Sequence, residues 1–564
     1  MPPGGPGVVP HTARSRFQRQ PLRKTVDFAE SPVSRVRKIL IGLVLLGLAG
    51  LAGFWILTAP LTWEILHARR DSPSDKAANL DNGRAMFLAA GCATCHATPG
   101  QSDETKLGGG GALPSDFGIF FMPNVSPDPD DGIGRWSEQQ FITAMREGVL
   151  PDGRHAYPAY PYTSYQRMTG DDLKDLFAYL RTLPPVKGKV RDNDLPFPFS
   201  MRRGIGMWKL VFLDGQPLTP DPSKGDAWNR GRYLVEGPMH CAECHSPRNA
   251  AGVIPSGMRF AGGPDPEGSG GWLPNLTNDG TGLASWTEAD LSQYLLTGKS
   301  PHGTTAGGSM GPVVRNAARL TQADRDAIAT YVKSLAPIKN APGASVAQAK
   351  TGAKVSASSR VLAALVQDGS AEAATSELLF TTTTISLYLD RPADSANAGP
   401  GAGKVLPATA LKVIARDGNW LHVTIEGWQQ AGAERAIFAL QGKRIITAAI
   451  TPDTASKLQQ KSTFEDPDTG LTWHQVELTA WVENKGMLPN VQNLWVYGSD
   501  LYGRTCGTCH AAKASTDYLA NQWPGTVGAM RRFTSLDDEQ VRFLEKYLQF
   551  HAKDVSQSDP QVTQ

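Results

Sequence analysis

The chain has 564 residues, a net charge of +2 and 20% charged residues. This length is enough for three or four ordinary domains, and 58 glycines with 41 prolines favour compact, loop-rich domains over one long regular fold. Residues 1–38 nevertheless hold eight Lys or Arg against two acidic residues. Because an apolar run follows this basic tail at once, the tail indicates a membrane partner and not a nucleic acid.

The apolar run is residues 39–59, ILIGLVLLGLAGLAGFWILTA, twenty-one residues without a charge. As a helix it is long enough to cross a hydrocarbon core of about 30 Å. Basic residues before the run predict a single-pass helix in a bacterial inner membrane, with a cytoplasmic N-terminus and the rest of the chain in the periplasm. The alternative is a cleaved signal peptide, whose apolar region is normally shorter and ends at a small-residue site.

All six cysteines lie in three copies of one motif: CATCH at 92–96, CAECH at 241–245 and CGTCH at 506–510. Residues i and i+3 of a helical turn project to one side, so both thiols can bond the two vinyls of one haem while the next histidine faces the iron. Zinc knuckles and redox disulfides do not require that histidine three times. The sequence therefore predicts three covalently bound haem c groups, attached through Cys92, Cys95, Cys241, Cys244, Cys506 and Cys509, with His96, His245 and His510 as iron ligands.

Two of these motifs belong to a duplicated segment. Residues 124–160 align with residues 275–310 with a single-residue gap. Each copy has a haem motif upstream and ends in an amphipathic helix that opens with a Thr cap and an acidic first turn. The repeat predicts two tandem, mainly-α domains at residues 80–190 and 225–337.

The order of motif helix, Gly/Pro loops, ligand loop and closing helix resembles class I cytochrome c. More closely, the segments GIGRWSE, FPFSMRRGIGMWKLVFL and RGRYLVEGPMHCAECHSPRN resemble the two-haem units that serve membrane-bound bacterial dehydrogenases as electron-transfer subunits. The resemblance implies a sixth iron ligand from the Met of a YPAMPY loop. Met310 fits this role in the second domain, whereas Tyr160 stands at the equivalent position of the first.

The sixth ligand of the first haem is therefore open. His155 is the favoured candidate, since it lies in the same loop and would give a bis-histidine site, and Tyr160 is its competitor as an anionic oxygen ligand. The other candidates are the thioethers of Met122, Met145 and Met168, and a site left open for a small ligand. Axial identity sets the potential of a haem, so the first and second haems are expected to differ in potential.

The C-terminal part divides into three segments. Residues 340–376 are rich in Ala, Gly, Ser and Lys and predict a linker. Short alternating segments in residues 378–485 predict a small SH3-like antiparallel barrel, with docking as its expected role. Residues 490–554 predict a third mainly-α cytochrome c domain, with Met530 as the sixth ligand and His551 as its competitor.

A second resemblance covers residues 378–554. The segments WLHVTIEGWQQ, EDPDTGLTW, NQWPGT and YLQFHAKD resemble the C-terminal half of the membrane-anchored pentahaem cytochrome of trimethylamine N-oxide or dimethyl sulfoxide respiration. In that family this half passes electrons to a periplasmic molybdenum reductase. The family begins with a four-haem quinol-oxidising module, whereas this chain has a two-haem module in that place.

These features predict a multi-domain, membrane-anchored tri-haem electron carrier of a respiratory chain, without a catalytic residue set. Electrons would come from the quinol pool or another cytochrome and pass to a periplasmic molybdenum S- or N-oxide reductase. An alternative reverses the flow, from a periplasmic dehydrogenase to quinone. An alternative of another class is a haem enzyme or sensor that uses an open first haem site.

Overall fold

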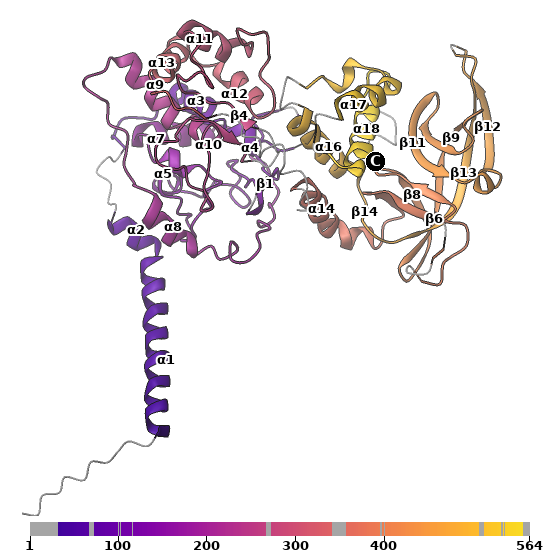
Figure 1. The fold of residues 1–564 in the computed structure, drawn as a ribbon, viewed down its shortest axis with the longest axis horizontal. Helices are drawn as coiled ribbons and strands as arrows, with labels where there is room; N and C mark the ends of the chain where they lie inside the picture. The colour runs from indigo at the N-terminus through magenta and orange to yellow at the C-terminus, as the bar shows by residue number, and fades with distance from the viewer. Residues whose placement is uncertain are drawn as a thin grey trace, which may run out of the picture. The chain divides into compact units, whose positions relative to one another are not determined.

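The computed structural model describes residues 32–66, 73–99, 101, 103–115, 117–266, 272–340, 357–394, 398–399, 401–467, 469–506, 512–531, 534 and 536–555. It divides into two units, Met1–Leu57 and Thr58–Gln564, which are described separately. The first unit contains α1 (Pro32–Leu57), drawn in indigo in Figure 1. Among the described residues, only the stretch Arg37–Leu57 of α1, with a mean hydropathy of 2.5, is long and apolar enough to cross a membrane. This agrees with the predicted span, except that the helix ends two residues before Ala59.

The second unit begins with two helical cytochrome-like domains. The first contains α2 (Pro60–Leu66), α3 (Leu80–Ala89), α4 (Cys92–His96), the hairpin β1 (Ala112–Ser115) and β2 (Gly118–Phe121), α5 (Glu138–Glu147), α6 (Tyr162–Tyr165), α7 (Gly170–Leu180) and α8 (Gly204–Phe212). The second contains α9 (Asp226–Glu236), α10 (Cys241–Cys244), the hairpin β3 (Gly263–Pro264) and β4 (Trp272–Leu273), α11 (Glu288–Thr297), α12 (Met310–Ala317) and α13 (Gln322–Lys333).

The two domains repeat the same local structure. Ser137 caps α5 and Thr287 caps α11, each in a capping box that also satisfies the backbone N–H of the cap residue. Both helices end at a glycine in the left-handed region, with φ of 57° at Gly148 and 72° at Gly298. The aligned segments of the sequence therefore fold alike, as the repeat predicts.

A close helix crossing holds each cytochrome domain together. The helix that precedes a haem motif meets the last helix of its domain at a glycine, where a Cβ would overlap the facing chain. These pairs are Gly83 on α3 against Tyr179, Gly231 on α9 against Tyr331, and Gly498 on α16 (Val491–Cys506) against Tyr547. Three domains thus share one packing solution, in which the missing side chain lets the two helices approach.

Residues 378–488 form an antiparallel sheet. Its strands are β5 (Leu378–Thr381), β6 (Ile385–Tyr388), β7 (Gly403–Val405), β8 (Ala410–Asp417), β9 (Trp420–Gln430), β10 (Ala436–Leu440), β11 (Lys443–Ile450), β12 (Gln459–Glu465), β13 (Thr472–Glu483) and β14 (Met487–Leu488), with α15 (Pro452–Ala455) between β11 and β12. The order is β12-β13-β6-β7-β11-β10-β9-β8-β5-β14, and β13 also pairs with β9. The predicted strands are present, but the sheet has ten of them, so the small SH3-like barrel is not confirmed.

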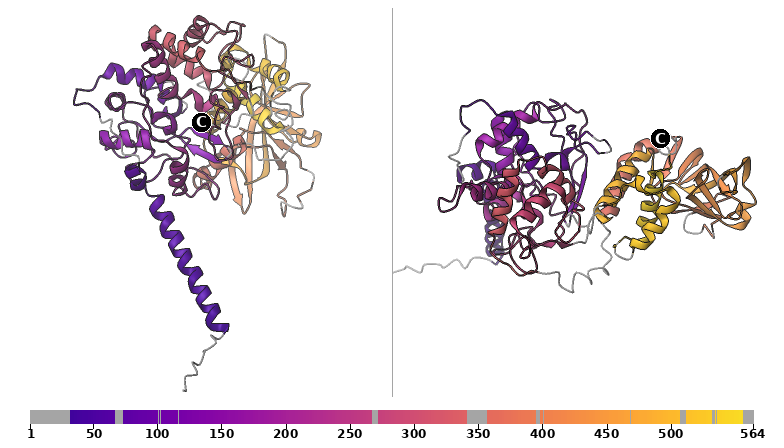
Figure 2. Two further views of the ribbon diagram at one scale, coloured as in Figure 1. Left: turned by 60° about the vertical axis from the view of Figure 1, so that its left-hand side comes forward. Right: turned by 90° about the horizontal axis from the view of Figure 1, so that it is seen from above.

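The third helical domain packs against this sheet. Besides α16 it contains the short turns Ser515–Asp517 and Ala520–Gln522, α17 (Trp523–Arg531) and α18 (Asp538–Phe550). On α18, the buried Lys546 donates from Nζ to the carbonyl of Pro407 at 2.8 Å and to the hydroxyl of Thr409 at 2.7 Å. Figure 2 shows these helices, in yellow, gathered along one side of the orange strands.

The segment expected to be a linker, residues 340–376, contains a helix. It is α14 (Ala357–Ala373), which packs against β14 and α16 and buries Val361 and Ala364. Apolar residues recur there at spacings of three and four, so the segment has a helical face despite its Ala- and Ser-rich composition. Residues 341–356 lie outside the described part.

The helix crossing can be tested at Gly231, where a Cβ would overlap the carbonyl of Ala327. We expect Gly231→Ala to destabilise the second cytochrome domain by about 1–3 kcal/mol, because the helices must move apart. Thermal unfolding followed by circular dichroism measures this loss. Gly280→Ala is the matched control, because no atom lies within 4 Å of a Cβ built there. Equal melting of the two variants would contradict a tight crossing.

Candidate haem centres

The structure orients the first two motif histidines in the same way. Nδ1 of His96 lies 2.8 Å from the carbonyl oxygen of Pro123, and Nδ1 of His245 lies 2.8 Å from that of Pro274. A carbonyl only accepts, so Nδ1 carries the proton and Nε2 keeps its lone pair. Burial also lowers the pKa of both rings. Each neutral imidazole is therefore fixed in the tautomer that binds a metal through Nε2.

Three motif cysteines lie in surroundings that disfavour the thiolate. Burial raises the pKa of Cys92 and of Cys241 to about 12, and that of Cys506 to about 11. Moreover, within the described residues no group of three or more His, Cys, Asp or Glu side chains is arranged to hold a metal ion. Cys509 and His510 lie outside the described part of the chain.

The described residues fit a haem attached at each of the first two motifs. A haem c would supply a one-electron iron couple, while the chain attaches it, orients its proximal imidazole and surrounds it with apolar side chains. Met310, the predicted sixth ligand of the second haem, begins α12 and packs half-buried on the domain core. Met530 lies on α17 with 37% of its surface exposed, and its competitor His551 has Nδ1 within 2.8 Å of the carbonyl of Tyr547.

The candidates for the sixth ligand of the first haem fall into different environments. His155 is buried, and its Nε2 donates to the carbonyl of Thr58 at 2.8 Å. Tyr160 instead donates its hydroxyl to the sulfur of Met145 at 2.5 Å and lies close enough to Cys92 to interact with it electrostatically. Burial raises the pKa of Tyr160, which keeps the phenol neutral. The sixth ligand stays a prediction, but this geometry favours the Tyr160 and Met145 pair over His155.

Two further methionines complete the set of candidates. Met168 is fully buried in the core that the two domains share, and its carbonyl accepts from the guanidinium of Arg146. Met122 is half-buried, and its backbone pairs with Gly110 and Gly111 downstream of the proximal histidine. Neither has a contact with the ligand loop that matches that of Met145.

The first two haem motifs are neighbours in space. Ala90 lies two residues before Cys92, and its carbonyl oxygen is 3.4 Å from Nε2 of His240, the residue directly before Cys241. The same carbonyl accepts from the hydroxyl of Tyr165 at 3.4 Å, and the rings of Tyr165 and His240 are 5.7 Å apart, edge to face. The two haem attachment sites therefore adjoin through one backbone carbonyl and two rings.

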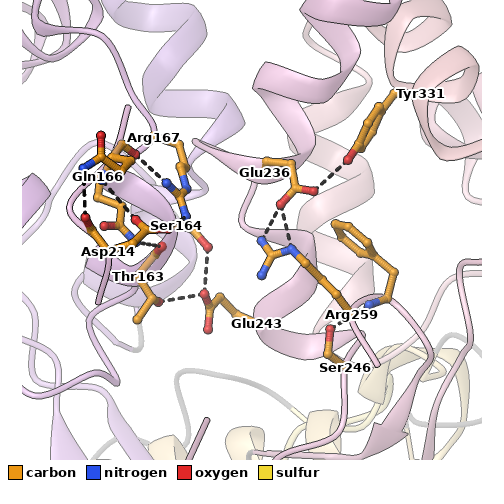
Figure 3. Close-up of polar contacts among 12 residues, drawn as sticks. Thr163, Ser164, Gln166, Arg167, Asp214, Glu236, Glu243, Ser246, Arg259 and Tyr331 are labelled. Atoms are coloured by element: carbon orange, nitrogen blue, oxygen red, sulfur yellow. Dashed lines mark hydrogen bonds and ion pairs between the residues drawn. The ribbon is translucent and has the colours of Figure 1, made fainter. Parts of the chain in front are cut away.

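A mostly buried carboxylate, with 13% of its side chain exposed, joins the same two domains. Glu243, inside the second haem motif, accepts from the hydroxyls of Thr163 and Ser164 at 2.7 Å each (Figure 3). It also pairs with Arg248. Burial acts to raise the pKa of Glu243, but Arg248 and the two hydroxyls lower it below its ordinary value. Thr163 and Ser164 follow the ligand loop of the first domain, so this loop is fixed to the second haem motif by charge-assisted hydrogen bonds.

Comparison with known proteins agrees with this architecture. The family model described as cytochrome c matches residues 80–184 and 229–336. A "diheme cytochrome c-type" protein of Cereibacter sphaeroides is 41% identical over 308 residues, which cover 54% of this chain and 99% of that relative. The chain belongs to the diheme cytochrome c family. The fructose dehydrogenase cytochrome subunit of Gluconobacter japonicus is 40% identical over 273 residues, 48% of this cytochrome and 55% of the subunit.

The C-terminal part of the cytochrome matches different relatives. The family model described as TorC third cytochrome c domain matches residues 373–487. The cytochrome c-type protein TorC of Escherichia coli O157:H7 is 38% identical over 156 residues, 28% of this chain and 40% of that protein. The predicted fusion of a two-haem unit with a TorC-like segment is thereby confirmed, and so is an electron carrier with covalently bound haem c.

Sequence analysis missed the residues that join the two haem motifs. Glu243 had a visible signal, because it puts a charge where the first motif has Thr94. His240 and Tyr165 had no such signal. Their roles depend on contacts between residues 75 or more positions apart, which no local pattern records.

The sixth ligand of the first haem can be identified by spectroscopy of variants. We expect Met145→Leu to alter the low-spin spectrum of a single haem, because it removes the sulfur beside Tyr160, whereas His155→Ala leaves the axial bands unchanged. Optical and electron paramagnetic resonance spectra of the oxidised protein provide the measurement. A new high-spin signal in His155→Ala alone would reinstate the histidine as ligand.

The junction at Glu243 gives a second prediction. Glu243→Ala leaves Arg248 without its charged partner and removes the hydrogen bonds to Thr163 and Ser164, each worth about 1.5–3 kcal/mol when charged. We expect amide hydrogen exchange in residues 160–168 to rise at least several-fold. Glu236→Ala is the matched control, because that carboxylate is shielded to a similar degree and binds Arg259 and Tyr331 within the second domain (Figure 3). Unchanged exchange in Glu243→Ala would show that this contact does not fix the loop.

Proposed function

We propose that this protein is a membrane-anchored, periplasmic tri-haem cytochrome that relays electrons in a respiratory chain. The observation that carries the proposal is the contact of the first two haem motifs through Ala90, His240 and Tyr165. Motifs this close keep their haems within the short range that outer-sphere transfer needs. The span before residue 58 would hold the relay at the membrane, with a cytoplasmic N-terminus.

The C-terminal segment is proposed as the electron-delivery end. Its likeness to TorC supports a periplasmic molybdenum S- or N-oxide reductase as the acceptor, reached through the third haem. Helix α18 packs on the sheet: Lys546 donates to the carbonyl of Pro407, and Glu539 accepts from the hydroxyl of Thr384, both residues lying between strands. This packing supports a single docking surface formed by the third helical domain and the sheet together. In the third helical domain Met530 is the proposed sixth ligand, and the SH3-like kind of barrel remains the proposed form of the sheet.

A second candidate function comes from the other set of relatives. Cytochrome subunits of fructose and alcohol dehydrogenases match the two-haem part. A periplasmic dehydrogenase would then reduce these haems, and the quinone pool would receive the electrons. The chain spans about half the length of these subunits, so the likeness applies to the electron-transfer unit and not to a whole complex.

The direction of flow can be tested by removing the third haem. In membranes given a quinol, we expect Cys506→Ser with Cys509→Ser to leave the first two haems reducible and to abolish electron delivery to an added molybdenum S- or N-oxide reductase. Stopped-flow absorbance of the haems measures both steps.

Cys241→Ser with Cys244→Ser is the matched control, in which the first haem reduces and the third stays oxidised. Unchanged delivery in the Cys506 and Cys509 variant would contradict the proposed acceptor end. Reduction by a dehydrogenase and not by quinol would favour the second candidate.

A further inference from the structure

An apolar surface is concentrated on one side of the first cytochrome domain. Fifteen large apolar side chains are exposed among the described residues after Leu57, and nine of them belong to two short segments. Those nine are Leu61, Ile65 and Leu66 on α2, and Phe197, Phe199, Met201, Met207, Val211 and Phe212 on or just before α8. Because α2 packs against α8 (Figure 1), we define the α2–α8 face as Leu61, Ile65, Leu66, Met207, Val211 and Phe212.

The polarity of α8 is reversed for a helix in water. Its one charged residue, Lys209, is 0% exposed, whereas Val211 is 65% exposed. The ammonium lies 5.2 Å from the ring centroid of the buried Trp63 on α2 and 5.9 Å from that of Tyr162, with no hydrogen-bond partner for Nζ. Burial of Lys209 lowers its pKa to about 8. A cation turned inward and valine turned outward is the arrangement expected where the outside is not water.

The chain itself determines what lies against this face. Only Thr58 and Ala59 separate the end of the apolar span at Leu57 from α2. At about 3.5 Å per residue, Leu61 lies no farther than about 14 Å from the last residue of the span. Since the headgroup layers add about 5–8 Å to each side of the hydrocarbon core, α2 begins within or beside the interfacial layer.

Hydrogen bonds fasten this exit point to α8 and to the ligand loop. Nε2 of His155 donates to the carbonyl of Thr58 at 2.8 Å, and Nε of Arg203 donates to its hydroxyl at 3.0 Å. Arg203 is the residue that precedes α8. The segment that leaves the span, the ligand loop and α8 are thus tied together, so α8 must stay close to whatever surface α2 meets.

We propose that the α2–α8 face lies in the interfacial layer of the bilayer that the span crosses. This rests on the membrane anchoring in the proposed function, and it adds a second, monotopic contact. The face holds the first cytochrome domain against the lipid, and the ligand loop lies next to α2, since Ala156 and Trp63 pack in one cluster. A lipid-soluble quinol would then reach this domain at the bilayer surface, and the domain would not swing freely on its anchor.

A carbene-generating hydrophobic photolabel dissolved in the bilayer tests the proposal. Full-length holoprotein is reconstituted into phosphatidylethanolamine and phosphatidylglycerol vesicles, irradiated and mapped by peptide mass spectrometry. We expect labelling in residues 39–57, 60–66 and 204–212, several-fold above that of residues 410–417, since the probe concentrates in hydrocarbon. Ile414 in this last segment is 54% exposed and serves as the internal reference.

The outcomes separate the two proposals. Labelling of residues 39–57 with reference-level labelling of residues 204–212 would overturn the α2–α8 face and leave the anchor intact. Absence of label from residues 39–57 would overturn the anchor and, with it, the face.

Variants that place charges on α8 test the proposal independently. Val211→Glu with Phe212→Glu should reduce labelling of residues 204–212 several-fold while residues 39–57 keep theirs, and Ile414→Glu is the matched control. The haem absorbance of each variant reports that the domains have folded. Undiminished labelling of α8 in the double variant would show that the probe binds the protein and not the bilayer around it, which would overturn the proposal.

Discussion

The constraint on which the structure depends is the close crossing of two helices in every cytochrome domain. A glycine on the helix before the haem motif, Gly83, Gly231 or Gly498, admits the last helix of the domain. The backbone of that helix lies closest at the first two glycines, and the ring of Tyr547 at the third. Because CxxCH follows directly on the motif helix, this crossing fixes where the thiols emerge. The carbonyls of Pro123 and Pro274 then turn the proximal imidazoles. The close approach of these two helices thus sets the position of the haem attachment site independently of any contact with the haem.

The two domains share one apolar core, and a few polar side chains also join their haem motifs. A carboxylate as shielded from water as Glu243 is costly unless paired, and its partners divide between Arg248 in its own domain and two hydroxyls in the other. The cost is offset only in one arrangement of the domains. This contact therefore contributes to specificity of the junction more than to stability, and it holds the motifs of Cys92 and Cys241 together for electron transfer.

Local patterns predicted what is local. The CxxCH motifs, the caps at Thr169 and Thr321 and the duplicated α5 and α11 were readable because each depends on residues within about one helical turn or on comparison of the two copies. Composition misled for α14, whose helical face is formed by few apolar residues. The extent of the sheet, and the contacts of His155 and His240, depend on residues distant in sequence and left no periodic signal.

The difference between the two ligand loops follows from their neighbours. In the second copy, Thr305 occupies the place of His155 and is exposed, and Pro312 occupies that of Tyr162. In the first copy, His155 holds the chain at Thr58 and Tyr162 lies under Lys209. A loop that must hydrogen-bond to Thr58, directly after the apolar helix, is constrained in ways that the second loop is not. Tyr160 stands where the second loop has Met310, so the two loops differ both at the predicted ligand position and in the hydrogen bond that only the first loop makes to Thr58.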